Sequence, residues 1–275
     1  MGLLDGKVAI ITGSGRGIGS SAALLFAEQG ASVVVNDVDA SPAEATAAAI
    51  ARAGGRAIQV TGDVTEPAFP ARLIEKALSA YGGIDILVNN AGFTWDAAIG
   101  NMSDQQWDAI LAVHLTAPFR ILREASRFLI EAAKNEQAEG GRAEPRKVIN
   151  VSSVSGVYGQ AGQANYAAAK AGIIGLTRAL AREWGRYNVQ VNAVCYGFIE
   201  TRLTETKGRG EKIHRGTDEV ALGLPRQVRQ LAPLRIPLGR SGTTEEAAGP
   251  MLFLASPLSN FVSGIVLEVT GGDTL

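Results

Sequence analysis

Tyr166 and Lys170 are four residues apart in the run Asn165-Tyr166-Ala167-Ala168-Ala169-Lys170. On a helix this spacing places the phenol and the ammonium on the same face. A free tyrosine has a pKa of ~10, and a neighbouring cation stabilises its phenolate. At an effective dielectric constant of ~20 and a separation of ~5 Å, the attraction supplies roughly 3 kcal/mol, or ~2 pKa units. The pair therefore predicts a proton-transfer device, although the same spacing also occurs on ordinary solvated helices.

A glycine-rich loop follows the first apolar segment and reads Thr12-Gly13-Ser14-Gly15-Arg16-Gly17-Ile18-Gly19. A helix-forming stretch begins directly after it at Ser20. Glycines there let the backbone approach a pyrophosphate at a helix N-terminus, where free N–H groups and the helix dipole favour an anion. The spacing is T-G-x-x-x-G-x-G rather than the strict G-x-G-x-x-G fingerprint. Its place between a strand and a helix nevertheless predicts a dinucleotide-binding loop.

Asp37 follows the second apolar segment, 20 residues after Gly17. A carboxylate in this position accepts hydrogen bonds from the 2′-hydroxyl of an adenosine ribose and repels a 2′-phosphate. We therefore expect NAD as the cofactor. NADP is the alternative, because Arg16 in the glycine loop could pair with a 2′-phosphate.

Short apolar runs alternate with longer stretches of helical periodicity, which is typical of βαβ units around a parallel sheet. The sequence predicts seven strands, at Lys7–Thr12, Ser32–Asn36, Arg56–Val60, Ile84–Val88, Lys147–Val151, Val189–Val194 and Gly264–Val269. Three helix starts carry the spacing of a capping box, at Ser41 with Glu44, Ser103 with Gln106, and Thr243 with Glu246. We expect a single α/β domain over residues 1–275, a Rossmann-type doubly wound seven-stranded sheet with helices on both faces.

Two segments interrupt this pattern. Asn135–Arg146 is polar and is expected to form a surface loop. Ile199–Gly242 is longer and rich in glycine, arginine and proline. A long connection at the C-terminal edge of a parallel sheet is commonly a binding lid, so we interpret residues 199–242 as a lid over the substrate, with an inert insertion as the alternative.

Composition limits the class of protein. The chain has 275 residues, 46% hydrophobic and 19% charged, and a formal net charge of −1, which gives no global bias toward nucleic acid or an acidic membrane surface. Between Arg202 and Arg235, however, eight Lys/Arg face four Asp/Glu, a local charge of +4. Cys195 is the single cysteine and His114 and His214 are the only histidines, so we expect no disulfide and no metal site. With no basic leader and no apolar run of membrane-spanning length, we expect a cytoplasmic protein that does not enter a membrane.

Together, these motifs closely resemble the short-chain dehydrogenase/reductase superfamily in its form with T-G-x-x-x-G-x-G, N-N-A-G (Asn89-Asn90-Ala91-Gly92) and Y-x-x-x-K motifs. The resemblance covers essentially the whole chain. Around Gly162–Gly172 it is most similar to the 3-oxoacyl-acyl-carrier-protein reductases, and bacterial 3-hydroxyacyl dehydrogenases share much of this segment.

The resemblance implies a role for each matching residue. Tyr166 is the general acid and base, Lys170 lowers its pKa and holds the cofactor ribose, and Ser153 bonds the substrate oxygen. Ser153 lies thirteen residues before Tyr166, as the family serine does, while Ser152 and Ser155 are expected to be structural. The implied cofactor contacts are the glycine loop, Asp37, Asp63, Val64, Asn90, Ala91, Gly92, Tyr166, Lys170, Ile199 and Thr201.

Two positions depart from the family. His114 stands where the family usually has a fourth catalytic residue, asparagine. Pro118 lies four residues later and has no N–H for the His114 carbonyl, so the helix should kink and leave this carbonyl to a water that serves the lysine. The alternative is a packed histidine without a catalytic role. Cys195-Tyr196-Gly197 replaces the usual Pro-Gly after the sixth strand, so the shape of the loop at the nicotinamide stays open; Cys195 is expected to be a small buried residue.

The resemblance implies an NAD(P)-dependent oxidoreductase that interconverts a ketone and a secondary alcohol. We expect a 3-oxoacyl thioester substrate carried on acyl carrier protein or CoA. Alternatives are another secondary alcohol, such as a sugar, cyclic alcohol or steroid, or a catalytically silent NAD-binding module. The resemblance also implies a homotetramer in which the helices of Tyr166 and His114 pair across subunits.

Overall fold

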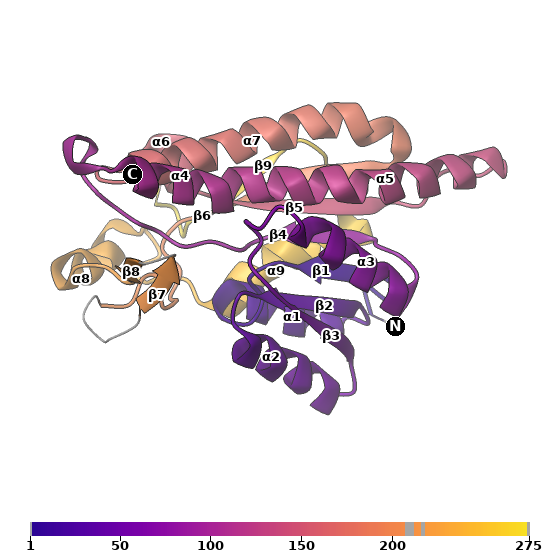
Figure 1. Cartoon of the computed structure of the whole chain (residues 1–275), viewed down its shortest axis with the longest axis horizontal. Coiled ribbons are helices and arrows are strands. Elements are labelled where there is room, and N and C mark those ends of the chain that lie inside the picture. The colour runs from indigo at the N-terminus through magenta and orange to yellow at the C-terminus, as the bar shows by residue number, and fades with distance from the viewer. Residues whose placement is uncertain (1, 207–211, 216–217, 274–275) are drawn as a thin grey trace.

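Seven apolar segments form one parallel sheet in the computed structural model, which describes residues 2–206, 212–215 and 218–273 (Figure 1). In spatial order the strands are β3 (Arg56–Thr61), β2 (Ser32–Asp37), β1 (Val8–Ile11), β4 (Ile86–Asn89), β5 (Arg146–Ser153), β6 (Val189–Tyr196) and β9 (Val266–Val269). Each predicted strand is present, with ends shifted by at most two residues. The central strands are buried along their whole length, because helices cover both faces.

The order of the strands reverses between β1 and β4, which creates the crevice where doubly wound sheets bind ligands. Because all neighbours in the sheet are parallel, Thr12, Asn90 and Ser153 all lie at its carboxyl edge. The sequence motifs that carry chemistry therefore come together at one edge.

The helices form two layers (Figure 1). On one face α1 (Gly17–Glu28) packs between α2 (Ala40–Arg52) and α9 (Thr244–Ala255). On the other face lie α3 (Phe69–Tyr81), α5 (Ala117–Ala138) and α7 (Ala164–Trp184). The shorter elements are α4 (Asp104–Leu111), α6 (Val154–Tyr158), α8 (Arg226–Arg235), η1 (Ile99–Asn101), the π-helical turn η2 (Ala112–Thr116), η3 (Gly185–Tyr187) and η4 (Pro257–Ser259).

Two of the three predicted capping boxes form. Ser103 and Gln106 cap α4, and Thr243 and Glu246 cap α9, each through reciprocal side-chain to backbone bonds of 2.9–3.2 Å. The third prediction is wrong, because α2 begins two residues earlier, with Asp39 rather than Ser41 at the N-cap. Pro42 is tolerated inside the first turn, where a backbone N–H has no partner within the helix.

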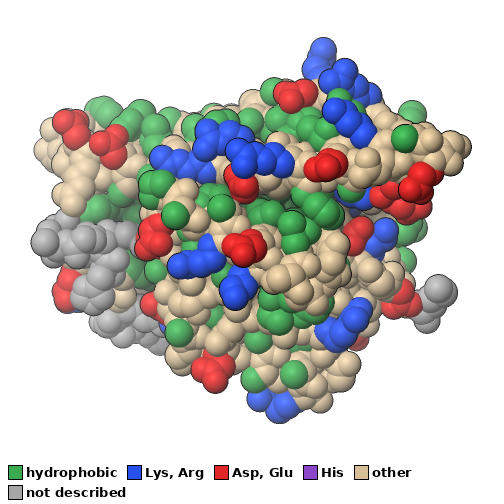
Figure 2. All heavy atoms as spheres, turned by 45° about the vertical axis from the view of Figure 1, so that its right-hand side comes forward, with side chains coloured by type: hydrophobic (Ala, Val, Ile, Leu, Met, Phe, Trp, Pro, Cys, Tyr) green, Lys and Arg blue, Asp and Glu red, His purple; other side chains and the backbone are tan. Residues whose placement is uncertain are grey.

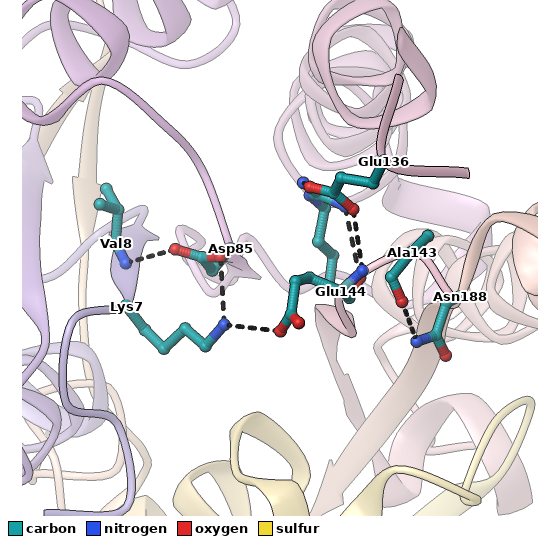
Figure 3. A network of polar contacts seen from close by, with 8 residues as sticks. Lys7, Val8, Asp85, Glu136, Ala143, Glu144 and Asn188 are labelled. Atoms are coloured by element: carbon teal, nitrogen blue, oxygen red, sulfur yellow. Dashed lines mark hydrogen bonds and ion pairs between the residues drawn. The ribbon is translucent and has the colours of Figure 1, made fainter. Parts of the chain in front are cut away.

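The predicted loop at Asn135–Arg146 is shorter than expected. Helix α5 continues to Ala138, because Glu136, Gln137 and Ala138 are good helix formers, and β5 already begins at Arg146. Arg146 is buried and its Nη2 lies 2.6 Å from Glu136 Oε1, which ties the end of α5 to the start of β5. Figure 3 shows Glu136 in this network, together with Glu144, Lys7 and Asp85 at the amino edge of the sheet.

The segment interpreted as a lid contains structure that the sequence did not predict. An antiparallel hairpin of β7 (Lys212–Arg215) and β8 (Asp218–Ala221) precedes α8. Residues 207–211 and 216–217 of the predicted lid lie outside the described residues. Leu222 is buried in the core cluster that also contains Phe93 and Val113, so the segment after the hairpin packs against the body of the molecule.

The surface carries mixed charge. In Figure 2, basic and acidic side chains are interspersed with apolar ones across the visible face, in keeping with the net charge of −1. Among the described residues, no helix is both long enough and apolar enough to cross a membrane.

Candidate active site

Tyr166 and Lys170 lie on one face of α7, as their spacing predicts. The Lys170 ammonium is 5.6 Å from the centroid of the Tyr166 ring. Lys170 is buried, and its Nζ donates a 2.6 Å hydrogen bond to the Val151 carbonyl of β5. The ammonium is thereby held between the helix and the sheet, below the phenol.

Burial dominates the titration of both groups. It raises the pKa of Tyr166 to about 12, while a hydrogen bond from Ser153 acts in the opposite direction. Burial also lowers the pKa of Lys170 to about 7, so the ammonium is only partly populated near neutrality. The expectation that Lys170 lowers the Tyr166 pKa is therefore wrong for this geometry, in which desolvation raises that pKa.

Ser153 reaches Tyr166 from the end of β5. It is the N-cap residue of α6, and its Oγ accepts a 3.2 Å hydrogen bond from the Ser155 N–H. Its side chain also lies close enough to Tyr166 to lower the pKa of that phenol. Ser152 instead donates to the Lys170 carbonyl at 2.8 Å, which fits the structural role expected for it.

His114 lies beside the catalytic pair on the π-helical turn η2. Ala117 N–H bonds to the Ala112 carbonyl, five residues back, so the helix is irregular just before Pro118, as predicted. The His114 ring stands edge-on to Tyr166 with centroids 4.9 Å apart, and its Nε2 lies 2.7 Å from the Phe93 carbonyl.

A carbonyl oxygen can only accept, so His114 carries its proton on Nε2. Burial, helped by Lys170, lowers the His114 pKa well below its ordinary value, and the imidazole is neutral. Its Nδ1 is buried without a hydrogen-bond partner among the described residues. Gly92 makes room for this ring, because a Cβ there would lie 2.1 Å from His114 Cε1.

The glycine loop is bonded to the ends of its neighbouring strands. Thr12 Oγ1 accepts from the backbone N–H groups of Asn90 and Ala91 at 3.0 and 3.1 Å, and Asn90 Nδ2 donates to the carbonyls of Thr12 and Gly13. Ser14 Oγ accepts from the Asn36 N–H at 3.1 Å. These bonds fix the loop between β2 and β4.

The loop leaves the start of α1 open to a ligand. Gly13 and Gly17 have φ values of 62° and 56°, which favour glycine, and a Cβ on Gly19 would lie 2.3 Å from the Gly13 carbonyl. The N-cap residue Arg16 makes no side-chain capping bond. The first N–H groups of α1 are thus available to an anion, as the pyrophosphate of a dinucleotide requires.

Asp37 ends β2 and is only 6% exposed. Its carboxylate accepts from the Gly15 N–H at 3.2 Å and from the Asp39 N–H at 3.1 Å, so it is fixed beside the glycine loop. Arg16, in contrast, points to Asp39, with Nη1 2.8 Å from its carboxylate.

The remaining predicted cofactor residues lie around the same edge. Asp63 follows β3 and bonds Thr65, Val64 is buried beside it, and Ile18 packs against the core cluster of α1 and α9. Ile199 is buried, and Thr201 lies next to the glycine loop, since a Cβ on Gly17 would be 3.7 Å from Thr201 Cγ2. The start of the lid segment therefore lies over the loop.

Tyr196 does not extend into the site. Its side chain is buried on the α9 side of the sheet, where its hydroxyl donates to the Ala247 carbonyl at 2.6 Å. The bulk that replaces the family's proline therefore anchors β6 to α9. Cys195 is fully buried, as expected of a small core residue, and burial raises its pKa to about 12.

Two residues near Tyr166 had no assigned role from the sequence. Gln163 Nε2 donates to Asp96 Oδ2 at 2.9 Å, and the Asp96 charge raises the pKa of Tyr166 further, after burial. Gln163 lies one helical turn before Tyr166, so its spacing could have placed it near the phenol. Asp96 lies 70 residues away from Tyr166 in the sequence, and no motif or spacing pointed to its contact with the site.

Comparison with known proteins decides the family. The family model described as short chain dehydrogenase matches residues 7–212. The chain belongs to the short-chain dehydrogenases. This short-chain dehydrogenase is 39% identical to the 3-oxoacyl-[acyl-carrier-protein] reductase FabG of Thermotoga maritima, over 98% of each chain. It is 40% identical to the hydroxyacyl-CoA dehydrogenase ChsB1 of Mycobacterium tuberculosis, over 98% of this chain and 78% of that protein.

Solved structures agree with the family. The gluconate 5-dehydrogenase of Burkholderia cenocepacia J2315, in complex with NADP and tartrate, superposes with a TM-score of 0.83 at 34% identity, over 98% of this chain and 96% of that one. The short-chain dehydrogenase is thus an NAD(P)-dependent oxidoreductase acting on CH–OH groups, with the Rossmann-type fold that its sequence predicted.

Proposed function

We propose that this short-chain dehydrogenase reduces 3-oxoacyl thioesters, and oxidises 3-hydroxyacyl thioesters in reverse, with Ser153, Tyr166 and Lys170 as the catalytic residues. The observation that supports the proposal is that Tyr166 and Lys170 share one face of α7 and that Lys170 bonds Val151 of β5, the strand that ends at Ser153. The nicotinamide cofactor supplies or accepts the hydride.

The protein's own contribution is the transfer of one proton and the stabilisation of the charges that this transfer leaves. With a pKa raised to about 12, Tyr166 is protonated near neutrality and can donate its proton to a developing alkoxide. The Ser153 hydroxyl stabilises the same oxygen by donating a hydrogen bond. Lys170, held against the Val151 carbonyl, stabilises the phenolate that remains.

The thioester substrate is supported by the relatives whose names specify acyl-carrier-protein and CoA compounds. The lid segment adds a physical argument. Helix α8 exposes a row of apolar side chains, Val228, Leu231 and Leu234, and ends in Arg235. Apolar and cationic side chains in one lid suit an acyl chain and the phosphates of a pantetheine carrier.

For the cofactor we propose NAD. The proposal is supported by Asp37, which is buried and fixed beside the glycine loop, because a carboxylate that meets the ribose would repel a 2′-phosphate. The Arg16–Asp39 pair is partly exposed and is worth about 0.2–1 kcal/mol, so it could be broken to serve a phosphate. The preference therefore depends on Asp37, and NADP remains the alternative.

Assembly and location are proposals from the resemblance. We infer a homotetramer in which the helices of Tyr166 and His114 pair across subunits, supported by the exposed Trp107 of α4 and Phe119 of α5. Light scattering tests it, and a monomer would reject it. A cytoplasmic location is supported by the lone cysteine, Cys195.

The decisive assay compares substrates and cofactors. Acetoacetyl-CoA should be reduced with NADH, faster than cyclic, sugar or steroid ketones, and Tyr166→Phe should abolish the reaction. Turnover of a non-thioester alone would replace the substrate proposal. Cofactor binding without any turnover would favour a silent NAD-binding module.

A further inference from the structure

A chain of hydrogen bonds leads from the surface to Ser155, two residues after Ser153. Gln163 is at its centre, at the N-cap of α7. Its Nε2 donates to Asp96 Oδ2 at 2.9 Å, and its Oε1 accepts from Ser155 Oγ at 2.9 Å. The chain thus joins the segment after β4 to α6 and α7.

The ionisation state of Asp96 fixes which group donates and which accepts in each hydrogen bond of this chain. An ionised carboxylate only accepts, so the amide of Gln163 must turn its NH₂ group to Asp96. Its oxygen then faces Ser155, whose hydroxyl has to donate. Asp96 therefore decides the orientation of a side chain that contacts Ser155.

The orientation matters because Ser155 controls Ser153. The Ser155 N–H donates to Ser153 Oγ at 3.2 Å, which occupies an acceptor site of that hydroxyl. The proton of Ser153 must then point elsewhere, because an N–H donor already occupies that side of its oxygen. A displaced Ser155 would leave Ser153 free to rotate.

The backbone around Asp96 is fixed to the same helix start. Ala97 N–H donates to the Gly162 carbonyl at 2.9 Å, and residues 97 and 163 form an isolated parallel bridge. Asn165 Nδ2 donates to the Trp95 carbonyl at 3.2 Å. Asp96 is therefore held in place although its side chain is exposed.

We propose that Asp96 and Gln163 are positioning residues, which orient Ser153 through Ser155 for the oxygen of the substrate. The proposal rests on the proposed function, since it assigns Ser153 to that oxygen. Neither residue needs to touch the substrate or the cofactor.

Kinetics separate positioning from other roles. Gln163→Leu should lower kcat about tenfold to a hundredfold, as small displacements of reacting groups do, and leave the KM for NADH unchanged. Gln160→Leu, in the exposed turn before α7, is the matched control and should have no effect. An unchanged kcat with a raised KM for the thioester would make Gln163 a substrate contact and overturn the proposal.

A double-mutant cycle tests the route through Ser153. In a Ser153→Ala background, Gln163→Leu should cost less than about twofold further, because the group it positions is gone. Equal losses in both backgrounds would show that Gln163 acts through general destabilisation and would contradict the proposal.

A second readout does not depend on turnover. In the part of the chain that the structure describes, the ionisable groups that act on or contact Tyr166 are Lys170 on α7, His114 on η2, Asp96 after β4 and Cys195 on β6. Burial is the main cause of the raised Tyr166 pKa, and the Asp96 charge adds to it. In Asp96→Asn the phenol should therefore ionise at lower pH.

The measurement is an ultraviolet phenolate titration of the holoenzyme, as the difference from the matching Tyr166→Phe protein. An unchanged Tyr166 titration in Asp96→Asn would contradict the proposed geometry. If the wild-type protein turns over no ketone, the proposed function fails, while this titration still decides whether Asp96 acts on the site.

Discussion

At the scale of residues, the chemistry depends on which groups contact the Lys170 ammonium and the Tyr166 phenol. Lys170 bonds a backbone carbonyl rather than a carboxylate, so its charge is not neutralised by a fixed anion. The Tyr166 ring lies edge-on to a neutral imidazole, and the Ser153 side chain lies close enough to lower its pKa. The site thereby keeps a protonated phenol next to a cation that titrates near neutrality.

His114 tests whether this neutral imidazole takes part. If the backbone of η2 serves the lysine, His114→Asn should retain kcat within about tenfold, since an asparagine amide can also donate to the Phe93 carbonyl. Steady-state kinetics check this, and a loss of two orders of magnitude would show that the ring is needed.

Gly92 provides the complementary variant. Gly92→Ala should displace the imidazole and lower activity, because the new Cβ would meet His114 Cε1 at 2.1 Å. Combining it with His114→Asn should restore part of the activity, since the smaller side chain leaves room. If the double variant recovered no activity, the loss in Gly92→Ala would come from a change in the backbone at Gly92 rather than from the displaced imidazole.

The proposed preference for NAD depends on Asp37, and Asp39 holds the Arg16 side chain beside it. In Asp37→Ser/Asp39→Asn the repulsion at the ribose is gone and Arg16 is released, so the ratio of kcat/KM for NADPH to that for NADH should rise about tenfold or more, equivalent to ~1.4 kcal/mol. Asp39→Asn alone should shift the ratio much less. If Asp39→Asn alone shifted this ratio more than the double variant does, Arg16 rather than Asp37 would determine the cofactor preference.

At the scale of elements, Tyr196 illustrates a substitution that looked functional in sequence and is structural in space. Tyr196→Phe removes the bond to the Ala247 carbonyl and should cost about 1 kcal/mol of unfolding free energy in urea titrations. The KM for NADH should not change. A several-fold rise in that KM with unchanged stability would show that Tyr196 instead contributes to cofactor binding.

The elements also show how far sequence reasoning extends. Strands, two capping boxes and the helical pair of Tyr166 and Lys170 were predictable, because each depends on local periodicity or spacing. The raised pKa of Tyr166 was not, since desolvation depends on what covers the side chain. Nor was the contact between Asp96 and Gln163, which the fold brings together across 67 residues.

At the scale of the whole molecule, buried lysines make stability depend on pH. Lys147 of β5 is buried with its Nζ 3.1 Å from Ser259 Oγ, and burial lowers its pKa from 10.5 to about 8. Between these values the unfolded chain binds more protons than the folded one, so this group makes stability rise with pH across that window.

The variant Lys147→Met isolates this effect. Its unfolding free energy should rise less between about pH 8 and 10 than that of the wild-type protein, because methionine fills a similar volume without a charge. Urea unfolding at the two pH values measures the difference. Parallel changes in both proteins would show that Lys147 titrates normally in the folded state.

The proposed function depends most directly on Tyr166 as the residue that donates the proton. The test is single-turnover reduction of acetoacetyl-CoA by Tyr166→Phe, with NADH binding measured on the same protein. We predict that turnover falls by at least about 10²-fold while NADH binds within a few-fold of wild type, because the hydroxyl is lost and the glycine loop is untouched. Turnover at the wild-type rate would contradict the role of Tyr166 as the proton donor.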